Sequence, residues 1–292
     1  MEEVIKVNHL NKQIGTKKVL HDISFTVSKG ECIALIGPNG AGKTTLFSCL
    51  LGDYSTEKTM ITVLKDSPRS KKLKDKVSVL YQENIIQKRM KVKELISFYR
   101  LIYNNPLSLQ EVDNILRFSE LQKNQFTEKL SGGQKRLLSF LLAVIGNPQI
   151  IFLDEPTAGM DTNIRQHFWK VISLLKKQGK TIIYSSHYIE EVEHTADRVL
   201  LLNKGQLIRD TTPYALRSEK EEKVFSIPIK YVNLVRDLTY IYDVELKKDN
   251  ICFTTQNPQK VWDIIYPQVD LADIEMNNIT LLKKIFTVTE DK

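Results

Sequence analysis

Apolar residues form two kinds of pattern along the first part of the chain: short segments of strand length and longer segments with helical spacing. Segments 31–36, 150–154 and 181–186 have the length of strands and are rich in apolar residues, and the run at 150–154 has the pattern of a strand buried in a parallel sheet. Apolar residues at helical spacing occupy 45–52 and the longer run 137–146. The pattern predicts an α/β fold in which helices cover a parallel sheet.

The pattern changes after residue 210, where shorter segments follow one another in the order β-α-β-β-α-β. This order is typical of a ferredoxin-like fold, and a last helix is expected at 278–286. We therefore expect two domains, the first over residues 1–210 and a small C-terminal α+β domain over residues 211–292. The six segments are 223–229, 231–241, 242–248, 251–256, 258–268 and 269–276.

Composition supports a folded chain and does not support a membrane span. The 292 residues are 42% hydrophobic and 26% charged, as in globular proteins rather than disordered ones. The run at 137–146 is the longest apolar candidate and is too short to cross a bilayer. The N-terminus carries acids where a secretory signal would be basic, so we do not expect secretion. The three cysteines lack metal-ligand spacing, which fits a reducing cytosol.

The net charge of +7 is unevenly distributed. The basic excess belongs to residues 1–210, whereas residues 211–292 are slightly acidic. The densest basic runs, 65–76 and 88–93, are interpreted as solvated faces or as surfaces near an anionic membrane. No aromatic residues alternate with these lysines as a nucleic-acid platform would require, so we expect no nucleic-acid partner.

Residues 37–44, "GPNGAGKT", fit the phosphate-loop pattern G-x-x-x-x-G-K-[ST], between a predicted strand and a predicted helix. Its glycines let successive backbone N–H groups converge on phosphate oxygens, and the helix that begins near Lys43 adds the positive end of its dipole. Lys43 is expected to reach the β- and γ-phosphates, and the Thr44 hydroxyl to bind magnesium. The candidate nucleotide-binding residues of this segment are Gly37, Pro38, Asn39, Gly40, Ala41, Gly42, Lys43, Thr44 and Thr45.

Two carboxylates follow the apolar run at 150–154. A parallel strand that ends at Asp154 brings this side chain to the carboxyl edge of the sheet, where the phosphate loop also lies. We expect Asp154 to help hold Mg²⁺. Glu155 is then placed to polarise the water that attacks the γ-phosphate.

Taken together, these motifs resemble the nucleotide-binding subunit of an ABC transporter over about residues 3–210. The motifs occur in family order: "GPNGAGKT", Gln82 in "LYQEN", "LSGGQKR", "IIFLDEP", "AGMD" and "SSHY". The resemblance implies a P-loop NTPase cassette with an α-helical subdomain at about 83–148, in which two cassettes sandwich ATP head to tail. Residues that would act across this dimer interface are Ser131, Gly132, Gly133, Gln134 and Asp161.

The resemblance also assigns two polar residues to catalysis. Gln82 would reach Mg²⁺ and the attacking water, and its loop would face the membrane partner. His187 follows the strand at 181–186 and would donate a hydrogen bond to the γ-phosphate. Outside the family context, a glutamine in a loop would have no assigned role.

One position departs from the family pattern. The family stacks an aromatic residue on adenine, usually just before a glycine, and the matching residue here is Ile14. Ile14 offers an apolar contact without a π-face, so the pattern predicts phosphate chemistry but not adenine selectivity.

We expect an ATPase, with ATP and Mg²⁺ as cofactors, that powers transport, and we expect the direction to be export. It would work with a transmembrane permease on another chain and a second ATP-binding subunit, at the cytoplasmic face of the cell membrane. The alternative is a soluble ABC ATPase that acts on ribosomes or DNA, but such proteins usually carry two cassettes or a long coiled coil. For the C-terminal domain, a regulatory or dimer-stabilising role and a purely structural one both stay open.

Overall fold

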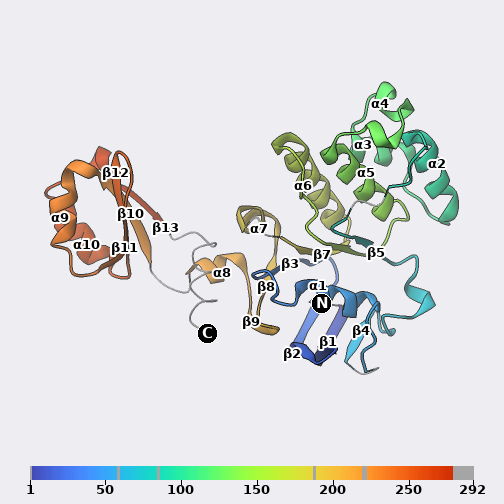
Figure 1. The fold of residues 1–292 in the computed structure, drawn as a ribbon, viewed down its shortest axis with the longest axis horizontal. Helices are drawn as coiled ribbons and strands as arrows, with labels where there is room; N and C mark the ends of the chain where they lie inside the picture. Colours follow the sequence, from blue (N-terminus) through green and yellow to red (C-terminus); the bar gives the residue numbers. More distant parts are fainter. Residues whose placement is uncertain (1, 58–59, 84–85, 187–188, 219–221, 279–292) are drawn as a thin grey trace. The chain divides into compact units, whose positions relative to one another are not determined.

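The computed structural model describes residues 2–57, 60–83, 86–186, 189–218 and 222–278. The chain divides into two compact units, Met1–Thr211 and Thr212–Lys292 (Figure 1). Each unit has its own hydrophobic core.

The first unit begins with an antiparallel sheet of the order β2-β1-β4. Strands β1 and β2 form a hairpin in which Gly15, at φ 58°, occupies the turn and Ile14 pairs with Lys17. Leu10 and Leu20 point from this hairpin into the core and are fully buried. The strands are β1 (Glu3–Ile14), β2 (Lys17–Ser28) and β4 (Ile61–Val63).

A six-stranded sheet of the order β5-β6-β7-β3-β8-β9 forms the centre of the first unit. All its neighbouring pairs are parallel except β8 and β9. The three apolar runs of the sequence form β3, β6 and β7, in which every residue is buried. This confirms the expected α/β cassette, and it brings the loops after β3, β5 and β6 to one edge. The strands are β3 (Cys32–Ile36), β5 (Val77–Leu80), β6 (Ile150–Leu153), β7 (Thr181–Ser185), β8 (Arg198–Asn203) and β9 (Gln206–Thr211).

Helices pack around this sheet, and α2 to α5 form a cluster beside β5 and α6 (Figure 1). The long apolar run of the sequence lies mostly in α5, where Phe140 contacts Phe168 of α6 edge to face, with ring centroids 4.8 Å apart. The helices of this unit are α1 (Lys43–Leu51), α2 (Val92–Ile102), α3 (Leu109–Leu116), α4 (Glu120–Asn124), α5 (Gly132–Val144), α6 (Thr162–Lys177) and α7 (Ile189–Thr195), with 3₁₀ turns η1 (Lys71–Leu73) and η2 (Thr127–Lys129).

The second unit contains a four-stranded antiparallel sheet of the order β11-β12-β10-β13. Phe225 and Phe253 stack in its core with an interplanar angle of 3°, and Val261 of α10 packs there. The elements are α8 (Pro213–Ser218), β10 (Lys223–Pro228), η3 (Ile229–Tyr231), α9 (Val232–Arg236), β11 (Ile241–Leu246), β12 (Asn250–Thr255), α10 (Pro258–Ile265), η4 (Leu271–Asp273) and β13 (Glu275–Asn278).

The end of this unit differs from the expectation of a strand at 269–276. The Asp270 side chain accepts a hydrogen bond from the Ala272 N–H and caps the 3₁₀ turn η4, so the strand begins only at Glu275. Beyond Asn278, the last helix expected from the sequence lies outside the described residues.

Two further observations concern the whole described chain. None of the helices in the described ranges combines the length and apolarity needed to cross a bilayer. All three cysteines, Cys32, Cys49 and Cys252, are buried and carry free thiols.

Candidate functional site

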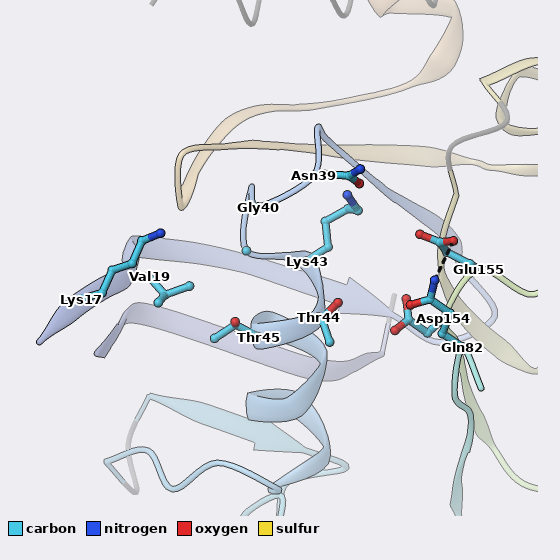
Figure 2. Close-up of a pocket in the computed structure, with 11 residues that line it drawn as sticks. Lys17, Val19, Asn39, Gly40, Lys43, Thr44, Thr45, Gln82, Asp154 and Glu155 are labelled. Carbon is cyan, nitrogen blue, oxygen red and sulfur yellow. Dashed lines mark hydrogen bonds between the residues drawn. The ribbon is translucent and has the colours of Figure 1, made fainter. Parts of the chain in front are cut away.

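A pocket of about 540 Å³ lies at the carboxyl edge of the six-stranded sheet (Figure 2). Its walls come from the start of β2, from the loop before α1 with the first turn of that helix, and from the segments after β5 and β6. Glu155, Asp154 and Gln82 lie at one end, and Lys17 and Val19 lie at the other (Figure 2). The lining residues are Lys17, Val19, Asn39, Gly40, Gly42, Lys43, Thr44, Thr45, Gln82, Asp154 and Glu155.

Close packing requires two glycines of the phosphate loop, Gly37 and Gly42. A Cβ at Gly37 would lie 2.2 Å from the carbonyl oxygen of Leu202, and a Cβ at Gly42 would lie 2.8 Å from the Leu20 side chain. Gly42 is also the N-cap of α1, with φ 106°, and provides no side-chain cap. The N–H groups of the first turn of α1 therefore stay available to the oxygens of an anionic ligand.

Lys43 lies in the middle of the pocket and is buried. Its ammonium donates hydrogen bonds to the carbonyl oxygens of Gly37, at 2.7 Å, and Pro38, at 3.1 Å. Burial lowers the pKa of Lys43, while the carboxylates of Glu155 and Asp154 act in the opposite direction. The pocket thus combines a cation with two acids in one small volume.

Ser185 holds both acids in place at the end of β6. Its hydroxyl donates to Asp154 Oδ1 at 2.5 Å and accepts from the Glu155 N–H at 2.9 Å. Glu155 has φ 46°, a left-handed conformation that a non-glycine residue adopts only when its surroundings impose it. Gln82 Nε2 donates to Glu155 Oε2 at 3.3 Å, the hydrogen bond drawn in Figure 2. The two side chains expected near the attacking water are therefore in contact.

Arg136 fixes the backbone behind these groups. It projects from α5, is fully buried, and donates to the carbonyl oxygens of five residues. Burial lowers the pKa of its guanidinium to about 10, partly offset by the charges of Asp154 and Glu155, so it is protonated at neutral pH. These carbonyl groups lie in the segments that follow β5 and β6, and they belong to Tyr81, Gln82, Asp154, Glu155 and Pro156.

The donor set fits Mg²⁺. Thr44 offers a hydroxyl, Asp154 a carboxylate and Gln82 an amide oxygen, and all three line the pocket. Mg²⁺ prefers oxygen ligands and usually takes only one or two carboxylates from the protein, together with waters and substrate phosphates. The described residues contain no group of three or more His, Cys, Asp or Glu side chains that could hold a metal ion.

The residues expected to act across a dimer do not line this pocket. Ser131 caps α5, and its hydroxyl and the Gln134 side chain form a reciprocal capping box. Asp161 caps α6 through a hydrogen bond from the Ile164 N–H at 2.9 Å. A Cβ at Gly133 would lie 3.0 Å from Ile164, so this glycine lets the start of α5 pack against α6. Ser131, Gly132 and Asp161 are exposed, and their role across an interface stays a prediction.

Four further predicted residues do not line the pocket. Ile14 lies at the hairpin end of β1 and is 41% exposed. Gly37, Pro38 and Ala41 belong to the loop but contribute no lining surface. His187 lies outside the described residues.

Sequence reasoning missed four residues of the site: Lys17, Val19, Ser185 and Arg136. Lys17 and Val19 share one face of their strand, as alternate residues do, but nothing in the sequence places that face beside the phosphate loop. Arg136 carried a signal, since an arginine among the apolar residues of a buried helix needs hydrogen-bond partners. Nothing in the sequence distinguishes Ser185 from Ser186.

Comparison with known proteins agrees with this geometry. Residues 20–158 match the family model described as "ABC transporter". The Nod factor export ATP-binding protein I of Rhizobium sp. (strain N33) is 34% identical over 263 residues, which cover 86% of each chain. The protein of the same name from Bradyrhizobium diazoefficiens is 36% identical over 217 residues, covering 72% of this chain and 71% of its own.

Two solved structures share the fold. The cbiO1 protein of Clostridium perfringens, part of the ABC transporter complex cbiONQ, is 29% identical with a TM-score of 0.65, over 75% of this chain and 92% of its own. The ATP-binding cassette MJ0796, solved as a dimer bound to ADP and Pi, is 20% identical with a TM-score of 0.61, over 71% of this chain and 98% of its own.

A P-loop cassette whose two acids meet its phosphate loop at one sheet edge defines a nucleoside-triphosphate-binding protein. The chain belongs to the ATP-binding proteins of ABC transporters. Proteins of this family hydrolyse ATP to power transport, and their ATP-binding domains function as dimers with transmembrane components.

Proposed function

We propose that this chain is the ATP-hydrolysing subunit of an exporter and acts at the cytoplasmic face of the membrane through a permease on another chain. The observation that carries the proposal is that one pocket brings together the phosphate loop, Lys43, Gln82 and the acids after β6. Its relatives are named for export of Nod factor, which supports the direction of transport. The cassette would comprise residues 1–210, and residues 211–292 would regulate it or stabilise its dimer.

The side chains of the pocket divide the chemistry between them. Lys43 and the N–H groups at the start of α1 bind the β- and γ-phosphates. Thr44, Asp154 and Gln82 would hold Mg²⁺, which would supply positive charge to neutralise the phosphate oxygens. Glu155 polarises the attacking water. The hydrogen bond from Gln82 orients the Glu155 carboxylate. The Ser185 hydroxyl fixes the backbone of Glu155 by accepting a hydrogen bond from its N–H.

The second nucleotide-binding subunit would complete the site. Residues 131–134 and Asp161 would contact the γ-phosphate held by the facing cassette, through the N-terminus of α5 and the cap of α6. Their position outside the chain's own pocket supports this role, as does the dimer of MJ0796. His187 would donate to the γ-phosphate, and Ile14 would contact the base.

A permease would dock on the helical cluster. Leu101 and Ile102 follow Phe98 by three and four residues on α2, and the three side chains are 86%, 55% and 52% exposed. Three apolar side chains at this spacing form one patch, and exposed apolar patches of this kind mark contacts with partners. The basic runs nearby would favour an anionic leaflet.

The test combines activity with location. The purified chain should release phosphate from ATP only with Mg²⁺, and Lys43→Met should abolish this release. In cells, Leu101→Glu should reduce crosslinking of the chain to an integral membrane protein without changing the hydrolysis rate of the isolated chain. Leu174→Glu, on an exposed position of α6, is the matched control and should change neither. Sedimentation with ribosomes or DNA in every background would contradict the proposal.

A further inference from the structure

Lys17 is a cation at the outer end of the pocket. It begins β2 and lies at the end opposite Glu155, with Val19 beside it on the same face of the strand (Figure 2). Its ammonium makes no hydrogen bond or ion pair with any residue in the part of the chain that the structure describes. Lys43, in contrast, donates to two carbonyls of its own loop. Lys17 is therefore available to a ligand.

The orientation of a nucleotide in the pocket follows from the position of the acids. If Glu155 polarises the attacking water, the γ-phosphate lies at the Glu155 end. The rest of the nucleotide then extends past Thr44 and Thr45 towards Val19 and Lys17 (Figure 2). The α-phosphate is the charged group of the nucleotide that comes nearest to this outer end.

Ile14 and Lys17 are directly opposite each other in the β1–β2 hairpin. Opposite residues of an antiparallel pair lie on the same face of the sheet, so the lysine lies beside the position where an aromatic side chain would stack on the base. The hairpin therefore presents a charge and an aliphatic side chain at this end, without an aromatic ring.

We propose that Lys17 is a nucleotide-binding residue whose ammonium contacts the α-phosphate, so that charge takes the place of base stacking in the affinity of this site. This deepens the proposed ATP site and rests on it. A contact with phosphate does not distinguish adenine from guanine, whereas a stacked or hydrogen-bonded base does. Lys17 therefore raises the affinity for ATP and GTP by the same factor and leaves the ratio of the two affinities unchanged.

The test measures the Kd of the full-length chain for ATP, GTP and 2′,3′-dideoxyATP, with Mg²⁺ present. Lys17→Met should weaken all three by a similar factor of about 3–10, the range of a partly exposed charge-assisted contact. The wild-type affinity should fall more steeply with salt than that of the variant. Lys17→Arg keeps the charge and should restore most of the affinity.

Lys18→Met is the matched control. Lys18 is also exposed, but it is the next residue of β2, belongs to the opposite face and does not line the pocket, so its loss should leave each Kd unchanged. Equal Kd values for wild type and Lys17→Met would overturn the inference. A weaker Kd of Lys17→Met for ATP but not for GTP would also overturn it, because this result indicates a contact with the base. An unchanged Kd for the dideoxy nucleotide would overturn it too, because this result indicates a contact with the ribose. Failure of the wild type to bind any nucleotide would instead refute the proposed function.

Discussion

The two ends of the pocket are built in different ways. At the inner end, Asp154 and Glu155 follow a buried strand, and Ser185 and Arg136 hold them through several hydrogen bonds. At the outer end, Lys17 belongs to a hairpin whose turn is open to solvent. The inner end can place reacting groups within a fraction of an ångström, because each is fixed by its neighbours. The outer end can change its residues at little cost to the fold. We infer that the inner end sets the rate and the outer end the affinity.

The largest effect is expected for Glu155→Gln. The amide keeps the size of the side chain but cannot act as a base, so hydrolysis should fall by about 10²–10⁴, the usual contribution of a general base. ATP affinity should stay close to that of the wild type, because the phosphate contacts are intact. Phosphate release and equilibrium binding of ATP on the same preparation measure the two quantities. Wild-type turnover in this variant would remove Glu155 from the role of base.

Arg136→Met tests whether buried hydrogen bonds hold the inner end together. The substitution leaves buried carbonyls without a donor, which should lower the free energy of unfolding by about 3–5 kcal/mol. Urea unfolding of the full-length chain measures the change. The neighbouring Lys135→Met, which removes a partly exposed charge, should stay within about 0.5 kcal/mol of the wild type. A similar midpoint for both variants would show that Arg136 does not stabilise this region.

Ile14→Tyr tests the outer end and should have the smallest effect. A ring at this position can stack on the base and should tighten ATP binding by about 0.5–1.5 kcal/mol. Competition between GTP and ATP, followed by equilibrium binding, should shift in favour of ATP. Unchanged affinity would mean that the base lies elsewhere.

The two ends also differ in how far the sequence predicts them. The phosphate loop and the acids could be predicted, because a strand, a glycine loop and a helix occur in a fixed order and strand ends share one sheet edge. The role of Arg136 could not be predicted, because its partners Tyr81 and Pro156 lie in the segments after β5 and β6, which only the fold brings together. The contacts of Ser185 with the two acids could not be predicted either, because they depend on the pairing of β6 with β7. Lys17 could not be placed without the position of the hairpin against α1.

In the second unit, the structure also differs from the sequence prediction where a local contact decides the outcome. The order of its elements could be predicted from alternating periods, but the start of β13 depends on the cap that Asp270 forms with Ala272. Local hydrogen bonds of this kind decide where an element begins, and an apolar pattern does not report them.

The most direct test of separate roles for the two ends is the double variant Glu155→Gln with Ile14→Tyr, compared with both single variants. ATP affinity and phosphate release should each be measured for all four proteins, so that a coupling free energy follows for each quantity. The account predicts that the double variant binds ATP as tightly as Ile14→Tyr alone and hydrolyses it as slowly as Glu155→Gln alone. A coupling well above about 0.5 kcal/mol in either quantity would contradict it.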